Sequence, residues 1–247
     1  QNLRVNNVID GEDNTLEKRL PRIKQIIDKY DADINCFQEC SLEWKPYTDE
    51  IFSPSEYTCV FMKTNVGHCN PIYVKNSRFN VIDSGSFELS SADTDTTYNE
   101  NRVASWIIVE DKLSSKSLMT VNGHLPLTSG VQIEACNRII SEVKSKSVDG
   151  YLICGDFNFT SKSNTVAYDI MTSNGTKDME AAADVEGTLG VSGGTFHNYG
   201  KLDTPNRIDF FFGSDSLTSN MHTVVIDTFD GLYPSDHYGI VNYVSIR

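Results

Sequence analysis

Residues 151–158 read Tyr-Leu-Ile-Cys-Gly-Asp-Phe-Asn, and this stretch decides how the rest of the chain is interpreted. The apolar run 151–154 is typical of a buried strand, and Gly155 gives the backbone the freedom to turn at its end. Asp156 and Asn158 then follow at alternate positions. An ordinary Asx-rich turn would account for these two residues alone, but polar side chains that follow a buried strand are also candidates for a functional site.

The chain on either side of this stretch predicts an α/β fold. Apolar residues recur every three or four positions over 16–30, 131–143 and 161–171, which predicts helices there. Shorter apolar runs predict strands over 3–9, 34–39, 57–62, 72–75, 81–89, 103–109, 117–123, 151–154, 207–212, 223–227 and 239–245. We therefore expect one domain spanning 1–247, in which two β-sheets pack together with helices outside.

The charge of the chain limits its partners. It has 247 residues, with 21 Lys and Arg against 34 Asp and Glu, for a formal net charge of −13. This balance excludes a basic protein that coats nucleic acid, and such a surface repels phosphate groups unless a bound divalent cation reverses the local charge. No apolar run reaches the roughly 18 residues that a membrane-spanning helix needs. We expect a soluble protein, either cytoplasmic or secreted after removal of a signal peptide.

Further polar residues fall within predicted strands or at their ends: Asn7, Glu39, His124, Asp209, Asp236 and His237. Each could be structural when taken alone, since a buried polar group needs only a hydrogen-bonding partner. Together with Asp156 and Asn158 they supply two imidazoles, four carboxylates and two amides, without a nucleophilic Ser or Cys beside a base. Such a set can hold one or two hard cations through oxygen and activate water, which favours metal-assisted hydrolysis of a phosphate ester.

The residues around these positions form a series of motifs: Leu3 to Val8, Cys36-Phe37-Gln38-Glu39, Asn122-Gly123-His124-Leu125, Gly155-Asp156-Phe157-Asn158, Arg207-Ile208-Asp209 and Ser235-Asp236-His237. In this order, and over nearly the whole chain, they resemble the endonuclease/exonuclease/phosphatase superfamily, which has the deoxyribonuclease I-like fold. Gly123 departs from the Thr that the family usually has at this position. The chain looks most like the compact bacterial metal-dependent hydrolases of the superfamily.

The resemblance implies a four-layered α/β sandwich, with two central mixed β-sheets packed face to face and helices outside. It also implies a requirement for Mg²⁺ or Mn²⁺. Carried over by position, Glu39 would be the principal metal ligand, with Asn7 beside it and Asp236 near the ion. The number of metal ions stays open, because Ile9 stands where some members have an additional acid.

The remaining motif residues receive catalytic roles from the same resemblance. Asp156 would orient or deprotonate the attacking water, and Asn158 would hold the phosphate. His237 would lie at the phosphate, kept charged by Asp209, while His124 would contact the phosphate from the other side. A carboxylate partner raises the pKa of an imidazole, which agrees with a charged His237 near neutral pH.

The substrate stays open between a small phosphorylated metabolite, a lipid headgroup and nucleic acid. Charge favours a small substrate, because a long duplex needs several Lys and Arg contacts. Arg102 and His197 are candidates for substrate binding, although an internal salt bridge or a structural role would also explain them. A nuclease is the main alternative, and a catalytically inactive binding module is a further one that would predict losses among the polar residues. We expect a monomer.

The cysteines leave one question open. Cys59 and Cys69 belong to neighbouring predicted strands, and their spacing allows a disulfide without requiring it.

Overall fold

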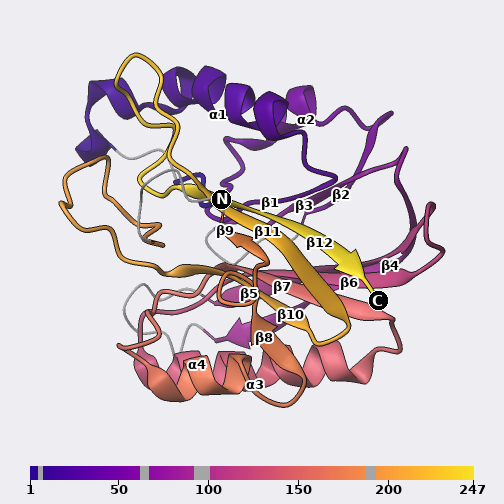
Figure 1. Ribbon diagram of the computed structural model, residues 1–247. Coiled ribbons are helices and arrows are strands. Elements are labelled where there is room, and N and C mark those ends of the chain that lie inside the picture. The colour runs from indigo at the N-terminus through magenta and orange to yellow at the C-terminus, as the bar shows by residue number, and fades with distance from the viewer. Residues whose placement is uncertain (5–7, 62–66, 92–100, 187–192) are drawn as a thin grey trace.

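The computed structural model describes residues 1–4, 8–61, 67–91, 101–186 and 193–247. The chain forms a layered sandwich, with helices on two outer faces and strands between them (Figure 1). Helices α1 (Leu16–Tyr30) and α2 (Lys45–Ile51) lie on one face, and α3 (Ser129–Ser145) and α4 (Thr165–Met171) lie on the opposite face. This confirms the predicted α/β class and its four layers. None of the helices in the described ranges is long and apolar enough to cross a membrane.

One β-layer is a six-stranded sheet with the order β4-β5-β6-β7-β10-β8. Its strands are β4 (Phe79–Ser90), β5 (Arg102–Asp111), β6 (Ser117–His124), β7 (Gly150–Asp156), β8 (Thr176–Asp178) and β10 (Asp209–Ser214). The face toward α3 and α4 carries a large apolar cluster in which Phe157, Phe159, Phe210 and Phe212 contact one another. Buried aromatic rings contribute much of the hydrophobic stabilisation of such a layer.

The other β-layer is divided into two three-stranded sheets, β1-β3-β2 and β12-β11-β9. Its strands are β1 (Ile34–Cys36), β2 (Tyr57–Val60), β3 (Ile72–Lys75), β9 (Val185–Glu186), β11 (Leu217–Val225) and β12 (Gly239–Ile246). Helix α1 covers it with Leu16 and Ile23, which pack in one cluster with Phe37 and Tyr73. The two facing β-layers that we predicted are present, with the second in two parts.

The described residues within 3–9, which are 3, 4, 8 and 9, are not in the strand that was predicted there. Asn2 pairs with Gln38 through an isolated parallel bridge, Arg4 has a left-handed backbone with a φ of 57°, and Val8–Asp10 is a 3₁₀-helix. A left-handed residue ends an extended run, because strands need a φ of roughly −120°. Asn7, a predicted metal ligand, lies outside the described residues.

A buried pair of amides joins the two β-layers beneath one edge of the sandwich. Gln38 Nε2 donates to Asn122 Oδ1 at 2.6 Å, and Asn122 Nδ2 donates to the carbonyls of Phe37 at 2.8 Å and Pro71 at 3.0 Å. Buried amides whose partners are all in place fix one arrangement of their surroundings. Since Gln38 directly precedes Glu39, this network holds that residue's segment against β6.

The six cysteines are all thiols, at positions 36, 40, 59, 69, 136 and 154. The disulfide that the spacing of Cys59 and Cys69 allowed is therefore absent from the described chain. The carbonyl of Cys69 instead accepts a hydrogen bond from the backbone N–H of Cys40 at 3.1 Å. Burial raises the pKa of Cys59 to about 11, so its thiol stays protonated near neutral pH.

Candidate active site

Three neighbouring strands of the six-stranded sheet place polar residues side by side at one edge. Strands β6 and β7 are parallel, and their register sets His124 opposite Asp156. Strand β10 is antiparallel to β7, so its first residue, Asp209, lies opposite the last residue of β7, Asp156. The carboxyl ends of parallel strands meet at one edge, and the start of an antiparallel neighbour joins them there. Three residues predicted from strand ends are therefore adjacent.

Gly155 makes this alignment possible. Its φ is 146°, and a Cβ at this position would lie 1.9 Å from the carbonyl oxygen of Gly123 on β6. No other residue fits at this distance, because a Cβ would overlap the neighbouring backbone. The Gly in the motif thus lets β6 and β7 approach where His124 and Asp156 must lie together.

A buried imidazole and carboxylate pair lies at this edge. His237 Nδ1 is 2.8 Å from Asp209 Oδ2, and His237 Nε2 is 3.8 Å from Asp156 Oδ2. Burial disfavours the charged imidazolium, but the carboxylates of Asp209 and Asp156 outweigh this cost and raise the pKa of His237 above its usual range. The imidazolium form therefore prevails near neutral pH, with Nδ1–H donating to Asp209.

Asp156 is approached by donors from several directions. Asn2 Nδ2 donates to its Oδ2 at 3.1 Å, and the backbone N–H of Asn158 donates to its Oδ1 at 2.9 Å. His124 Nε2 lies 3.6 Å from the same Oδ2. Burial and repulsion from Asp209 raise the pKa of Asp156. A carboxylate with a raised pKa is a stronger base than an exposed one, which suits proton abstraction near neutral pH.

A second set of carboxylates lies beside this pair, and we call Glu39, Asp236 and Asp10 the acidic group. Asn2 Nδ2, which bonds Asp156, also donates to Glu39 Oε1 at 3.0 Å. The guanidinium of Arg4 lies among the three carboxylates. It bonds Asp10 at 3.0 and 3.2 Å and lies 3.6 Å from Asp236 and 3.9 Å from Glu39. Carboxylates gathered in a largely buried place need compensating positive charge.

The acidic group fits a hard divalent cation. Its donors are carboxylate oxygens with an amide nearby, which are the ligands that Mg²⁺ and Mn²⁺ prefer. Another set of ligand atoms, from Asp156, Asp209 and His237, lies within 4.8 Å of one another. In that set the hydrogen bond between His237 and Asp209 already occupies one nitrogen and one oxygen. In the acidic group, the guanidinium of Arg4 likewise occupies both oxygens of Asp10 and leaves Glu39 and Asp236 as the candidate ligands.

His124 is held by Arg102, whose Nη1 lies 3.1 Å from His124 Nδ1. Burial and the positive charges of Arg102 and His237 lower the pKa of His124. Because a guanidinium can only donate, Nδ1 accepts and the proton of the neutral ring is on Nε2, toward Asp156. Arg102, predicted as a substrate ligand, thus contacts the site through His124.

Two further predicted site residues, Asn158 and His197, make hydrogen bonds to backbone carbonyls of neighbouring segments. Asn158 Nδ2 donates to the carbonyl of Leu125 at 2.8 Å. His197 is 1% exposed, its ring is stacked on Tyr238 with 3.9 Å between centroids, and its backbone N–H donates to the carbonyl of Asp236 at 3.0 Å. His197 therefore lies behind the segment that carries Asp236. The substrate-binding roles of Asn158 and His197 stay predictions.

Sequence reasoning missed Asn2 and Arg4. Asn2 contacts Glu39 and Asp156, which lie 37 and 154 positions away in the chain, so no local pattern reveals these contacts. The available signal was the run Asn2-Leu3-Arg4, which places two polar side chains at alternate positions around one buried Leu. That signal is weak, since such a run is equally typical of the start of an ordinary strand.

The sandwich has the deoxyribonuclease I-like fold. The model of the Endonuclease/Exonuclease/phosphatase family matches residues 9–237, so the chain belongs to this family. Family members hydrolyse phosphate esters and generally depend on divalent metals. No curated protein sequence matches the chain significantly.

Several solved structures share the fold. An endonuclease/exonuclease/phosphatase from Bacteroides vulgatus has a TM-score of 0.87 and 23% identity, covering 100% of this chain and 97% of that one. The mannosyl-6-phosphatase of Bacteroides thetaiotaomicron has a TM-score of 0.85 and 23% identity, over 99% and 97%. TDP2 from D. rerio, complexed with a single-strand DNA product, has a TM-score of 0.74 and 17% identity, over 93% and 92%.

Proposed function

We propose that this protein is a divalent-metal-dependent phosphoesterase that hydrolyses a phosphate ester through attack by water. The observation that carries the proposal is the position of Asn2, whose Nδ2 donates to Glu39 at 3.0 Å and to Asp156 at 3.1 Å. This amide sets the acidic group beside a carboxylate that can take a proton. Glu39 and Asp236 would hold Mg²⁺ or Mn²⁺, which when bound supplies Lewis-acid activation of the phosphate.

The protonation of each buried group suits a separate role. Asp156, with its raised pKa, would accept a proton from the attacking water. His237, held as an imidazolium by Asp209, would donate to phosphate oxygens as negative charge grows on them. His124, neutral and protonated on Nε2, would supply a second donor. All four side chains are buried, and in a site with little water such interactions are strongest.

The substrate that we propose is a small phosphate ester of the sugar phosphate type. A net charge of −13 opposes the approach of a long polyanion. The mannosyl-6-phosphatase of Bacteroides thetaiotaomicron, which has the same fold, acts on a substrate of this type according to its name. A nuclease is the second candidate, favoured by the likeness to TDP2 with its single-strand DNA product.

The test compares a sugar phosphate, p-nitrophenyl phosphate, bis-p-nitrophenyl phosphate and a single-stranded oligonucleotide as substrates, each with Mg²⁺, Mn²⁺ or EDTA. We expect metal-dependent hydrolysis of the monoesters, lowered at least about 100-fold by EDTA or by Glu39→Gln. Asp149→Asn is the matched control, because Asp149 is a carboxylate hydrogen-bonded to Ser117, outside the site. It should keep the full rate.

The other outcomes separate the candidates. Faster cleavage of the oligonucleotide and the diester than of the monoesters would replace the small substrate with nucleic acid. Full activity of Glu39→Gln would overturn the assignment of the metal to the acidic group. A wild-type protein that hydrolyses none of these esters, and that binds neither Mg²⁺ nor Mn²⁺ by calorimetry, would leave the inactive binding module as the better description.

A further inference from the structure

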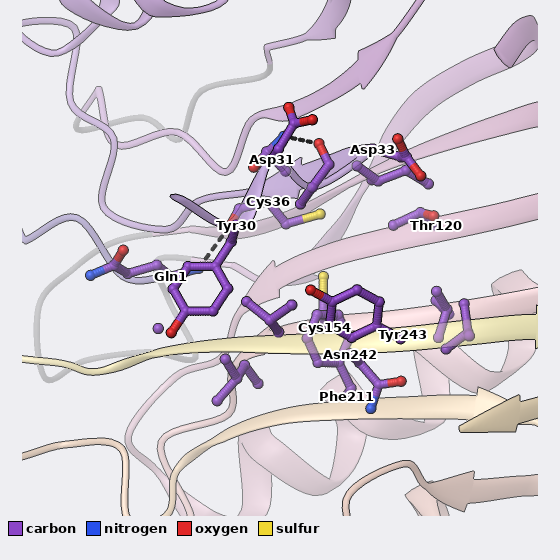
Figure 2. Close-up of a pocket in the computed structure, with 18 of the residues that line it drawn as sticks. Gln1, Tyr30, Asp31, Asp33, Cys36, Thr120, Cys154, Phe211, Asn242 and Tyr243 are labelled. Atoms are coloured by element: carbon purple, nitrogen blue, oxygen red, sulfur yellow. Dashed lines mark hydrogen bonds between the residues drawn. The ribbon is translucent and has the colours of Figure 1, made fainter. Parts of the chain in front are cut away.

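The six-stranded sheet has different neighbours on its two faces. One face borders a cavity of about 640 Å³ that lies between the sheet of β1 and the sheet of β12, where Thr120, Cys154 and Phe211 are among the lining residues (Figure 2). The other face packs against α3 and α4 through the large apolar cluster. Polar side chains of these two helices also reach the chain just beyond the ends of β6 and β7, and Gln132 in the first turn of α3 is the first of them.

Two short segments lie side by side where β6 and β7 end, and we call 124–126 and 156–158 the site segments. Leu125 N–H donates to the carbonyl of Asp156 at 2.8 Å, and Asn158 Nδ2 donates to the carbonyl of Leu125 at 2.8 Å. The backbone N–H of Asn158 donates to Oδ1 of Asp156 at 2.9 Å. The direction of the Asp156 carboxylate therefore depends on how the two site segments lie against each other.

Gln132 joins the two site segments with one amide group. Its Nε2 donates to the carbonyl of Pro126 at 2.9 Å and to the carbonyl of Asn158 at 3.0 Å. A side-chain amide nitrogen has two hydrogens, and here each is directed to a different segment. Because Gln132 is 2% exposed, water competes little for these bonds. One buried, planar group thus sets the separation of the two segments.

Asn164 determines the orientation of the Gln132 amide. Its Nδ2 donates to Gln132 Oε1 at 2.8 Å and to the carbonyl of Ser129 at 3.1 Å. Its Oδ1 accepts from the backbone N–H of Ala167 at 3.2 Å, which caps the start of α4. Because a backbone N–H can only donate and a backbone carbonyl can only accept, both amides have a single orientation that satisfies every bond. A buried network that is satisfied in this way holds one arrangement of its surroundings.

We propose that Gln132 is a positioning residue for the reaction, which keeps the proposed donor His124 and the proposed base Asp156 in place by holding the two site segments together. This role rests on the proposed phosphoesterase function. The amide of Gln132 bonds backbone carbonyls and Asn164, so it acts on the reacting groups through the backbone. Placement of this kind matters because a displacement of about 1 Å can lower a rate by roughly 100-fold.

The first test is Gln132→Met, which keeps the length of the side chain and removes both donors. For the ester that the wild type hydrolyses fastest, we expect kcat to fall about tenfold or more while KM changes by less than about twofold, because the substrate still binds but the base is displaced. Val143→Ala is the matched control. Val143 is 1% exposed in the last turns of the same helix and packs in the apolar cluster, so its truncation should lower the Tm without lowering kcat.

A second variant, Asn164→Asp, changes the orientation of the amide alone. Asp caps a helix about as well as Asn, so α4 keeps its cap, but a carboxylate cannot donate to Gln132. We expect kcat to fall by a smaller factor, about threefold. Asn137→Asp is its matched control, because Asn137 is exposed on α3 and donates to the carbonyl of Ile133. The same change in charge there should leave kcat unchanged.

Amide hydrogen exchange gives a readout that needs no activity. The N–H groups of Leu125 and Asn158 both donate to Asp156, so their exchange reports on the site segments. Gln132→Met should speed exchange at both by about tenfold or more beyond its effect on Ile153, which lies in the middle of β7 and exchanges through global unfolding. Val143→Ala should affect these two amides no more than it affects Ile153.

Several results would overturn the proposal. Full kcat in Gln132→Met, or unchanged exchange at Leu125 and Asn158, would show that the site segments keep their place without this amide. An equal loss of kcat in Val143→Ala would show that the stability of α3 controls the rate. If Gln132→Met fails to fold, Asn164→Asp decides the question, and equal rates in Asn164→Asp and Asn137→Asp would refute the role.

The proposed function can fail separately. A wild-type protein that hydrolyses none of the esters would overturn the phosphoesterase function and the positioning role with it. An active wild type whose rate survives Gln132→Met would overturn the positioning role alone.

Discussion

The two β-layers of this protein differ in how completely they are built. The six-stranded sheet is continuous and has four phenylalanine rings in contact beneath α3 and α4. The opposite layer is divided into two sheets with a cavity of about 640 Å³ between them. The site draws on both, since Asp156, Asp209 and His124 come from the continuous sheet, and Asn2 and Glu39 belong to the divided layer.

The two β-layers therefore hold their parts of the site in different ways. Strand register sets His124, Asp156 and Asp209 opposite one another in the continuous sheet. The acidic group depends instead on loops and on an isolated bridge between Asn2 and Gln38. We infer that the position of the acidic group is easier to alter by mutation than the alignment of His124, Asp156 and Asp209.

Substitutions in the two layers should have different kinetic signatures, and this is the largest effect that we predict. Asp156→Asn removes the proposed base, so kcat should fall by roughly 10² to 10⁴ without rescue by added metal. Glu39→Gln removes a proposed cation ligand, so part of its loss should be recovered when Mg²⁺ or Mn²⁺ is raised. Rates measured across a metal titration for both variants give the comparison.

His237→Gln is the companion variant, because its side chain touches both Asp209 and Asp156. It should behave like Asp156→Asn. If Asp156→Asn were rescued by metal and Glu39→Gln were not, the division of roles between the two layers would be reversed.

The next prediction compares the two faces of β10. Phe212 is fully buried against the phenylalanine cluster, whereas its neighbour Phe211 is half-buried and lines the cavity. Phe212→Ala should lower the free energy of unfolding by about 3–5 kcal/mol, because it opens a void in a packed core. Phe211→Ala adds space to a cavity that already exists, so its cost should be nearer the common value of about 1 kcal/mol.

Urea unfolding of both variants measures this difference. Equal losses in the free energy of unfolding would mean that the side of β10 that faces the cavity is as well packed as the side that faces α3 and α4.

The sequence predicted the continuous layer well because its signals are local. Apolar runs marked β6 and β7, and the polar residues at their ends indicated His124 and Asp156. Asp209, an acid in an aromatic run, could be singled out because a charge among aromatic residues needs a partner. The structure supplies that partner in His237.

The divided layer was harder to predict because its contacts join distant residues. Asn2 contributes to the site through its hydrogen bonds to Glu39 and Asp156, and no spacing within the sequence predicts these contacts. The left-handed backbone of Arg4 interrupts a run that is apolar enough to predict a strand over 3–9. Division of a sheet into two parts depends on which edges find partners, and edge pairing is a tertiary property that a strand pattern does not contain.

The smallest predicted effect concerns pH and contrasts two buried histidines. His222 on β11 is 1% exposed, and burial together with the charge of Arg207 lowers its pKa to about 4. Its pKa in the unfolded chain is about 6.5. Between that pH and about 4, the unfolded state therefore binds a proton that the folded state does not bind. The stability contributed by neutral His222 is complete above pH of about 6.5 and falls as the pH drops to 4 and below, by at most roughly 3–4 kcal/mol.

His237 has the opposite dependence. Its pKa is raised in the folded state, so its contribution to stability is complete below the unfolded pKa and is lost as the pH rises through the folded pKa.

His222→Gln should reduce the loss of stability between pH 7 and pH 5, because the lowered pKa of His222 contributes to that loss. Urea unfolding at both pH values measures it, and the dependence of stability on pH above 7 should stay unchanged. His68→Gln, at a half-buried histidine outside the sheets, is the control. An unchanged acid dependence in His222→Gln would show that the imidazole finds a proton acceptor, for which the Glu180 carboxylate at 3.4 Å is the nearest candidate.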